Sequence, residues 1–475
     1  MCALSRVQLE HILARARQDC SLASLVEDVD AVSQYRSIRD RFNTPTWSYR
    51  CLMNEIDAER TASAIDYSAE QTYPFDLVDV AQLVPVKCIT INETNVGNFK
   101  DTMDWLYNAI IYSQSLEIIQ FTRNTNTEPF IACLHETLKA RALNLHSPLL
   151  VHLYPNFSDN ASYYLERLID EGLLRGISFS SDDQVVGSMC TRLLDTIFKS
   201  RELELIGLQV SVLNREQFRF LMTDTTAMSN VKRRHVSLSG VYTSTLDVIL
   251  PYLFQSTSLR SLRLDESMLR RDMPILVEQL KLNGKSLTYL SLWDCWLESS
   301  DTDMLLQILT THTSVSLLDI GNNNATSGAL ARYAQTATSI SSLRLSGLRL
   351  DRGWTEELIL ALGSCRSLTE LNVAASSLDD CALYAIYKAM IEPCKSKERI
   401  RCDFRFNDME VGTVQRLLSY AAGILSRQPS INDSCRIIEL HLCVKCKRED
   451  MDELRRMCED LRKYITTINC YYSLL

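Results

Sequence analysis

Large apolar residues in the middle of the chain recur in short alternating runs that follow the pattern L-x-x-L-x-L-x-x-N. Alternation with a period of two is typical of a β-strand that buries one face. Five such runs begin 28, 28, 25 and 28 residues apart, at 259–264, 287–292, 315–320, 340–345 and 368–373. A nearly fixed period of this size predicts a repeat architecture, in which each unit buries its apolar face against its neighbours.

Looser matches extend the pattern in both directions to thirteen units with an average spacing of about 29 residues. The upstream units begin at Val86, Leu116, Pro148, Leu174, Leu203 and Val231, and the downstream units at Arg401 and Ile437. The repeats at Val231 and Arg401 could each be shifted by two residues, because alternating apolar residues fit the pattern in either register.

The ninth position of the pattern carries Asn or another small residue in most units. We expect these side chains to turn inward and to hydrogen-bond the backbone between repeats. Two positions later most middle units carry an apolar residue, which supports the alignment because that position was not used to find it. The ninth-position residues are Asn124, Asn156, Asn323, Ser211, Ser239, Ser267, Cys295 and Ser376.

Segments with helical periodicity lie between the strand-like runs, for example at 273–280 and 304–309. Each unit is therefore predicted to be a strand, a turn and a helix. Repetition of this unit builds a parallel sheet on the inside and a layer of helices on the outside, which curves because helices are wider than strands.

The runs LRSLRLDES, LTYLSLWDC and LTELNVAAS resemble leucine-rich repeats of the ribonuclease-inhibitor type. The resemblance covers residues 86 to 446 and is strongest from 259 to 378. It implies an α/β fold, namely a leucine-rich repeat solenoid or horseshoe with a parallel inner sheet and outer helices, and a role in binding another protein. Fold alone supports that role only by analogy.

The two ends carry no repeat. Residues 1–82 are predicted to be helical and to cap the first repeat, with residues 83–446 as the solenoid and 447–475 as a C-terminal capping helix. A recruiting module is the alternative for the N-terminal region. An F-box would fit the apolar spacing before Trp47, but its Leu-Pro start and Ile-Phe pair are absent.

Composition narrows the function. The 50 Lys and Arg against 59 Asp and Glu give a net charge of −9, which disfavours nucleic acid and anionic membrane as partners. No apolar run reaches the roughly 20 residues of a membrane helix, and the 16 cysteines are dispersed as in a reducing compartment. We expect an intracellular, cytoplasmic protein, with cytoskeletal association or mitochondrial import as alternatives.

Motifs for catalysis are missing from the sequence. It contains no phosphate-binding GxxxxGK[ST] loop, GxGxxG, HExxH or GxSxG motif. Cys443 and Cys446 form a lone CxxC pair, whereas a structural zinc needs four ligands that converge. The sequence therefore predicts a protein without enzymatic activity, cofactor or metal.

A partner-binding wall can be assigned from the strand pattern. Positions four and six point into the core, so positions three, five and seven line the concave face. Trp, Tyr and Arg often anchor protein interfaces. The alternative is that the aromatic residues only stack on neighbouring strands. The predicted wall consists of Arg233, His235, Arg263, Asp265, Tyr289, Trp293, Asp319, Arg344 and Glu370.

The predicted function is a non-enzymatic scaffold or adaptor that binds a protein on this concave face, as a soluble adaptor or as a subunit of a cytoskeletal or ciliary assembly. The alternative is a regulator of an enzyme, either a ubiquitin-ligase substrate adaptor or a GTPase activator. The identity of the partner and the oligomeric state are not encoded in any feature of the sequence that we recognise.

Overall fold

The computed structural model describes most of the chain after residue 109 and two short strands before it. The described residues are 64–67, 88–91, 110–111, 116–121, 127–143, 146–153, 159–179, 191–209, 218, 232–241, 246–311, 314–391, 399–407, 409–425, 437–446, 448–461 and 467–474. The chain divides into two compact units, Met1–Ser237 (unit 1) and Leu238–Leu475 (unit 2). Each unit is described by itself.

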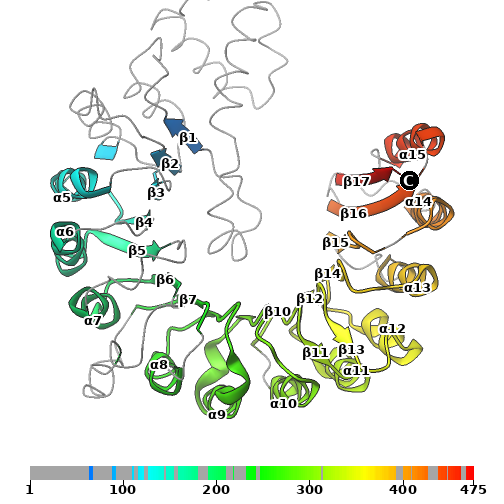
Figure 1. Cartoon of the computed structure of the whole chain (residues 1–475), viewed down its shortest axis with the longest axis horizontal. Coiled ribbons are helices and arrows are strands. Elements are labelled where there is room, and N and C mark those ends of the chain that lie inside the picture. The colour runs from blue at the N-terminus through cyan, green and yellow to red at the C-terminus, as the bar shows by residue number, and fades with distance from the viewer. Residues whose placement is uncertain are drawn as a thin grey trace, which may run out of the picture. The chain divides into compact units, whose positions relative to one another are not determined.

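Unit 1 is a parallel sheet with helices packed along one of its faces (Figure 1). Strands follow one another in chain order, and the unit boundary falls inside the last of them, β7. The strands are β1 (Ala64–Tyr67), β2 (Cys88–Ile91), β3 (Ile118–Phe121), β4 (Leu149–Leu153), β5 (Leu174–Phe179), β6 (Leu205–Gln209) and β7 (His235–Ser239). The helices are α5 (Thr127–Leu143), α6 (Asp159–Asp170) and α7 (Thr191–Lys199).

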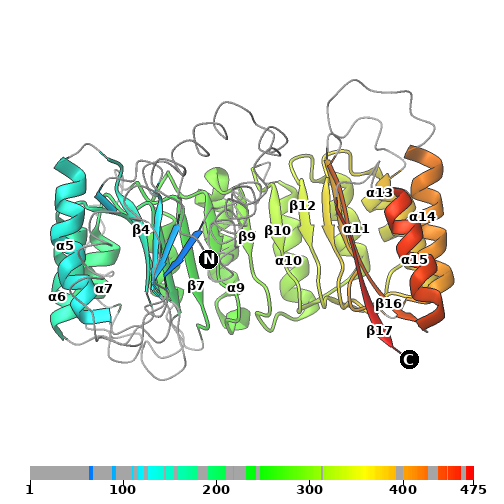
Figure 2. The same ribbon diagram turned by 90° about the horizontal axis from the view of Figure 1, so that it is seen from above.

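Unit 2 repeats this arrangement, and its neighbouring strands run side by side in Figure 2. The strands of its main sheet are β8 (Ser261–Arg263), β9 (Tyr289–Ser291), β10 (Leu317–Asp319), β12 (Ser342–Arg344), β14 (Glu370–Asn372), β15 (Arg399–Asp403), β16 (Ile437–Cys446) and β17 (Thr467–Leu474). Its helices are α8 (Leu246–Leu253), α9 (Met273–Asn283), α10 (Ser299–Thr310), α11 (Ser327–Thr336), α12 (Glu356–Ser364), α13 (Asp380–Ile391), α14 (Val411–Leu425) and α15 (Arg448–Leu461). A second sheet joins β11 (Asn324–Ala325) to β13 (Arg349–Leu350).

The register of the strands confirms most of the predicted repeat alignment. In unit 1, the fourth-position residues Ile89, Ile119, Val151, Ile177 and Ile206 are paired across successive strands. In unit 2, Leu262, Leu290, Leu318, Leu343 and Leu371 are paired in the same way. Except for Ile89, whose side chain lies outside the described residues, all of these side chains are at most 1% exposed, as expected for the row that packs against the helices.

Both repeats with an open register are shifted by two residues from the predicted start. The N–H groups of Arg234 and His235 donate to the Glu204 carbonyl, as second and third positions do elsewhere, so this repeat begins at Arg233 and not at Val231. Cys402 pairs with Leu371, so the later repeat begins at Arg399 and not at Arg401. An arginine therefore occupies the first position in both repeats, where the pattern calls for leucine.

The inward role of the ninth position is confirmed at Asn323. Its amide oxygen accepts hydrogen bonds from the N–H groups of Cys295 and Leu297, both at 3.0 Å. Its amide nitrogen donates to the carbonyl of Leu292, one repeat earlier, at 2.7 Å. One side chain thus satisfies backbone groups that the strand leaves unpaired where it ends.

Other small residues at the ninth position form part of the same bonding. The Ser267 hydroxyl accepts from the Val241 N–H at 2.9 Å, and the Ser376 hydroxyl donates to the Leu345 carbonyl at 2.9 Å. The corrected register moves Ser239 from the ninth to the seventh position. Asn124, Asn156 and Ser211 lie outside the described residues.

The ends of the chain contain strands that the sequence pattern did not predict. Strand β1 lies in the region expected to be helical, and it pairs in parallel with β2. Helix α15 lies in the predicted C-terminal cap, but β17 follows it and pairs with β16 over eight residues. The segment before Trp47, for which an F-box was the alternative to a cap, lies outside the described residues.

Candidate functional site

The strand face of unit 2 is the surface formed by the third, fifth and seventh positions of the repeats from Ser261 to Arg405, on the side of the sheet away from the helices. It contains seven of the nine predicted wall residues, and Arg233 and His235 belong to unit 1. The corrected register adds Arg401 at the third position and moves Asp403 and Arg405 from the third and fifth positions to the fifth and seventh. Most of these charged groups are bonded to one another.

In the first two repeats of this face, the Asp265 carboxylate accepts hydrogen bonds from its own repeat and from the next one. One carboxylate oxygen accepts a hydrogen bond from the Ser291 hydroxyl at 2.6 Å and from the Trp293 N–H at 3.0 Å. The other oxygen accepts from the Arg263 guanidinium, in the same strand. Asp265 is only 2% exposed, so its carboxylate fixes the next repeat rather than offering a charge to a partner.

The two aromatic residues of the predicted wall pack against the sheet. Tyr289 is 5% exposed. Trp293 is partly exposed, and its ring lies over Gly321, where an added Cβ would stand 2.8 Å from Trp293 Cδ1 and 2.6 Å from the Ser346 carbonyl oxygen. The missing side chain at position 321 makes room for the indole, which supports the stacking role for this tryptophan.

Acidic and amide side chains at the fifth position bond the backbone two residues further on. The Asp319 carboxylate accepts from the Gly321 N–H at 3.0 Å, and the Asn372 amide oxygen accepts from the Ala374 N–H at 3.0 Å. This local bonding is favourable for Asp and Asn at turns, because it satisfies the first N–H groups after a strand.

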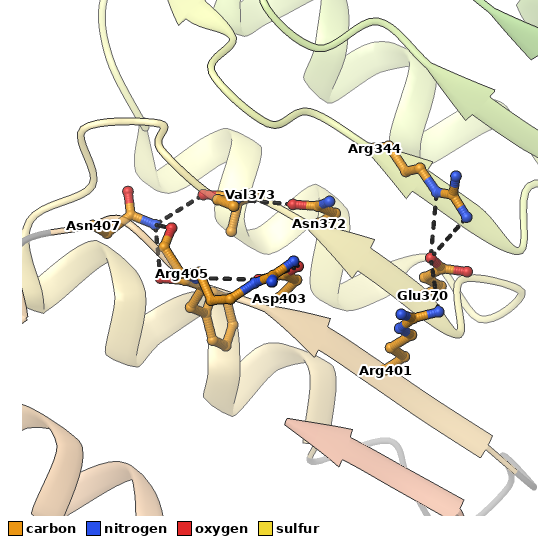
Figure 3. Close-up of polar contacts among 10 residues, drawn as sticks. Arg344, Glu370, Asn372, Val373, Arg401, Asp403, Arg405 and Asn407 are labelled. Atoms are coloured by element: carbon orange, nitrogen blue, oxygen red, sulfur yellow. Dashed lines mark hydrogen bonds and ion pairs between the residues drawn. The ribbon is translucent and has the colours of Figure 1, made fainter. Parts of the chain in front are cut away.

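Glu370 lies between two arginines from the neighbouring strands (Figure 3). Both the Nε and an Nη atom of Arg344 donate to its Oε1 at 3.3 Å, and Arg401 Nη1 lies 3.8 Å from the same oxygen. Arg344, Glu370 and Arg401 are 13%, 21% and 33% exposed at their side chains, so the exposed part increases toward Arg401. The strand face here presents cationic groups that a carboxylate holds in fixed positions.

The next repeat contains a second ion pair and a second ninth-position asparagine (Figure 3). The Arg405 guanidinium donates to both carboxylate oxygens of Asp403, with the shortest bond at 2.6 Å. Asn407 accepts from the Ser376 N–H at 3.1 Å and donates to the Val373 carbonyl at 2.9 Å. The predicted wall did not include these residues, although Asp403 and Arg405 stood at the third and fifth positions of the alignment that began at Arg401. Asn407, which becomes the ninth position when the repeat begins at Arg399, was the signal for the correct start.

Arg233 does not lie on an exposed wall, and this part of the prediction is wrong. Its side chain is fully buried in unit 1, and its guanidinium donates to the carbonyls of Ile197 at 3.3 Å, Phe198 at 2.7 Å and Ser200 at 3.3 Å. The guanidinium also lies 5.8 Å from the centre of the Phe198 ring. Arg233 therefore closes the end of helix α7. His235 follows it at the third position and is partly buried.

His152 lies in strand β4 of unit 1, at the fifth position of the repeat that begins at Pro148. Its Nδ1 lies 3.0 Å from the Ser178 hydroxyl on the neighbouring strand. Burial lowers the pKa of His152 to about 4, so the imidazole is neutral at neutral pH. A neutral, 7% exposed histidine in this position contributes to packing rather than to charge recognition.

Potential metal ligands do not converge in the part of the chain that the structure describes. There, no group of three His, Cys, Asp or Glu side chains could hold a metal ion. Cys443 of the CxxC pair is a free thiol. Burial raises the pKa of the Cys295 thiol, which also donates to the Leu264 carbonyl and so takes part in the ninth-position bonding. Among the described helices none is long and apolar enough to cross a bilayer.

The repeat length and the parallel register of both units, together with the ninth-position bonds of unit 2, define a leucine-rich-repeat fold. No known family model matches the chain, and no curated protein matches it. Solved structures with similarity include the C-terminal domain of tropomodulin from Caenorhabditis elegans, with 18% identity and a TM-score of 0.27, covering 32% of this chain and 95% of that chain.

Two longer matches cover more of the chain. The leucine-rich repeat-containing protein LegL7 from Legionella pneumophila has 13% identity and a TM-score of 0.38, covering 70% of this chain and 98% of its own. The protein in the TLR13–ssRNA13 complex has 12% identity and a TM-score of 0.34, covering 86% of this chain and 64% of its own. The ribonuclease-inhibitor subtype stays a prediction from the sequence.

Proposed function

We propose that the chain is a non-enzymatic scaffold or adaptor that binds a protein partner on the strand face of unit 2. The observation that carries the proposal is the fixed row of charges formed by Arg344, Glu370, Arg401, Asp403 and Arg405. Every one of these side chains is bonded within the face, yet the arginines at 401 and 405 remain about one third exposed, at 33% and 34%.

A row of this kind suits recognition of another protein. Its guanidinium groups are already oriented, so a partner's carboxylates can bind them with little further loss of side-chain entropy. Fixed charges of alternating sign also discriminate between partners, because a like charge in the wrong place is costly. These arguments support binding; the identity of the partner and the cellular location stay predictions.

Affinity capture followed by mass spectrometry tests the proposal. The bait is the full chain with Arg401→Glu and Arg405→Glu, compared with wild type. The matched control reverses two arginines outside the strand face, Arg332→Glu in helix α11 and Arg352→Glu in the loop before α12. We expect the strand-face variant to lose partners that both the wild type and the control retain.

Retention of every partner by the folded strand-face variant would overturn the proposal. The set of lost partners also separates the predicted roles. Loss of cullin-adaptor components indicates a ubiquitin-ligase adaptor, loss of a GTPase indicates an activator of that class, and loss of the subunits of one large assembly indicates a structural role. Circular dichroism on each bait shows that it is folded.

A further inference from the structure

Two large apolar side chains are exposed side by side at the turns that follow strands β8 and β9. Met268 is 52% exposed and Trp296 is 68% exposed. Both occupy the tenth position of their repeats, one residue after Ser267 and Cys295 at the ninth. We call Met268 and Trp296 the turn patch. It is separate from the strand face, which the third, fifth and seventh positions form.

Bonds on either side of the turn patch hold its two turns together. Before it, the Glu266 N–H donates to the Trp293 carbonyl at 2.8 Å. After it, Arg270 Nη1 lies 2.7 Å from Glu298 Oε1. Between the two side chains, the Leu269 N–H donates to the Cys295 carbonyl at 3.4 Å, which brings the backbones of Met268 and Trp296 next to each other.

The backbone at Trp296 does not favour a tryptophan. Its φ is 58°, in the left-handed region that suits Gly or Asn and is unfavourable for bulky residues. The tenth position of the repeat at Leu368 has the same conformation, with Ser377 at φ 51°. The turn itself can therefore be made with a small polar residue, and neither burial nor backbone preference explains an exposed indole at position 296.

The charges around the turn patch are mainly negative. Glu266 and Asp294 occupy the eighth positions of the same two repeats, and Glu298 follows at the twelfth. The cations Arg270 and Arg271 follow Met268, and Arg270 is paired with Glu298. An exposed indole face flanked by carboxylates is complementary to a guanidinium or ammonium group, which stacks on the ring while the carboxylates neutralise its charge.

We propose that the turn patch docks a basic segment of a partner protein, with an arginine stacked on Trp296 and its aliphatic part against Met268. Thioether and methylene groups pack well together, and the stem of an arginine covers apolar surface while its head stays near water. Recognition at this site is independent of the strand face, which would select partners by its own row of charges.

Binding of a fluorescein-labelled decapeptide with three arginines and one leucine to the full chain tests this proposal by fluorescence anisotropy. We expect Trp296→Asn to weaken binding about fivefold, in line with a stacked cation and its apolar contact. The double variant Glu266→Gln, Asp294→Asn should weaken it about threefold. A peptide with citrulline in place of arginine should bind no more tightly than the arginine peptide binds Trp296→Asn.

Matched controls separate this site from general attraction to an acidic protein. Phe406→Asn removes another aromatic residue that is 70% exposed, with φ 57°, and should leave the affinity unchanged. Glu356→Gln with Glu357→Gln removes two carboxylates from helix α12 and should also leave it unchanged. The strand-face variant with Arg401→Glu and Arg405→Glu should bind the peptide at least as well as wild type, whatever the fate of the proposed function.

Three results would overturn the proposal: no saturable binding by the wild type, equal affinity of wild type and Trp296→Asn, or equal weakening by the α12 variant and the Glu266, Asp294 variant. Thermal unfolding gives a further readout. Asn is more favourable than Trp at φ 58°, so Trp296→Asn should unfold at the same or a higher temperature. A lower unfolding temperature would assign Trp296 a structural role and overturn the docking role.

Discussion

Units 1 and 2 share one repeat but carry different side chains on their strand faces. In unit 1 the third positions of β4, β5 and β6 are Leu150, Gly176 and Leu205, and an added Cβ at Gly176 would stand 2.6 Å from Leu150 Cδ1 and 2.8 Å from Leu205 Cβ. In unit 2 the corresponding row includes Glu370 and Arg401, which are ion-paired and partly exposed. These three positions of unit 1 are uncharged and closely packed, whereas the third-position row of unit 2 carries an ion pair in strands β14 and β15.

The difference shows which positions the fold requires. Apolar residues at the fourth and sixth positions and bonding residues at the ninth recur because they form the core and satisfy the backbone. The third, fifth and seventh positions tolerate leucine, glycine, histidine, glutamate or arginine within the same backbone. Variation at these positions is therefore free to serve binding, and the charges of unit 2 are better candidates for recognition than the packed row of unit 1.

The largest expected effect on stability comes from a ninth-position residue of unit 2. Asn407→Ala leaves the Ser376 and Leu378 N–H groups and the Val373 carbonyl without their partner. Buried backbone groups without hydrogen bonds are costly, so we expect the free energy of unfolding to fall by about 4 kcal/mol. Asn324→Ala, which removes a single bond to the Leu297 carbonyl, should cost about 1 kcal/mol.

Hydrogen exchange shows where that damage occurs. Exchange should increase in residues 373–378 of the Asn407 variant and stay unchanged in unit 1, because local opening is confined to the segment that lost its bonds. Equal loss of stability in the two asparagine variants would mean that the ninth position has no special role in unit 2.

A buried arginine should have the next largest effect, in unit 1. Arg141 is 2% exposed, and its guanidinium donates to the carbonyls of Ile110 at 2.6 Å and Leu116 at 3.1 Å. Arg141→Met keeps an aliphatic side chain but leaves these carbonyls unpaired, so denaturation should show a loss of about 3 kcal/mol. The exposed ion pair of Arg175 with Glu204 is the control, and Arg175→Met should cost no more than about 0.5 kcal/mol.

Acid should weaken unit 1 through His152. Its pKa is about 4 in the folded chain, below the value of about 6.5 expected after unfolding. As pH falls below 6.5, the unfolded state takes up the proton first, so the stability that depends on neutral His152 is full above pH 6.5 and declines toward pH 4. Between pH 6.5 and pH 4 the free energy of unfolding of the wild type should fall by about 2 to 3 kcal/mol through this histidine.

The variant His152→Gln isolates this contribution. Its unfolding temperature should change less than that of the wild type between pH 6.5 and pH 4, and hydrogen exchange should localise the difference to β4 and β5. Identical pH profiles for the two proteins would show that His152 is protonated without consequence in the folded state.

The smallest effect should come from the strand-face charges of unit 2. Arg401→Ala removes a partner of Glu370 that is one third exposed, and Glu370 keeps its bonds to Arg344. Such ion pairs contribute little, so chemical denaturation should show a change of at most about 0.5 kcal/mol. A loss above about 2 kcal/mol would mean that this row of charges stabilises the sheet and would remove the contrast with the packed row of unit 1.

Prediction from the sequence succeeded where a repeat position carries the residue type that the pattern requires there. Leucines at the fourth position and aliphatic residues at the sixth located strands β8, β9, β10, β12 and β14, and Asn323 predicted the inward bonding. It failed at Arg233 and Arg399, because a first position is expected to be apolar. The buried arginine at position 233 bonds the helix-end carbonyls of Ile197 and Phe198, whose proximity the sequence does not reveal.

The candidate site was predictable only in part. Arg344, Glu370 and Trp293 were found from the pattern. The shift by two residues hid only Arg401, because Asp403 and Arg405 keep strand-face positions in either register. The ion pairs among them depend on the distance between side chains of adjacent strands, which a repeat alignment alone does not give. Trp296 was missed because the tenth position has no assigned role in the repeat, and its exposure depends on the left-handed turn.

The left-handed turn at the eighth position gives the repeat a site for variation. In unit 2 this conformation occurs with Gly, Glu, Asp, Asn, Ala and Phe, at Gly240, Glu266, Asp294, Asn322, Gly347, Ala375 and Phe406. Since the backbone adopts one shape whatever the residue, a library randomised at the eighth and tenth positions should keep the fold while altering what the turns display. Natural divergence can use the same route, acquiring new partners along this edge without repacking the core.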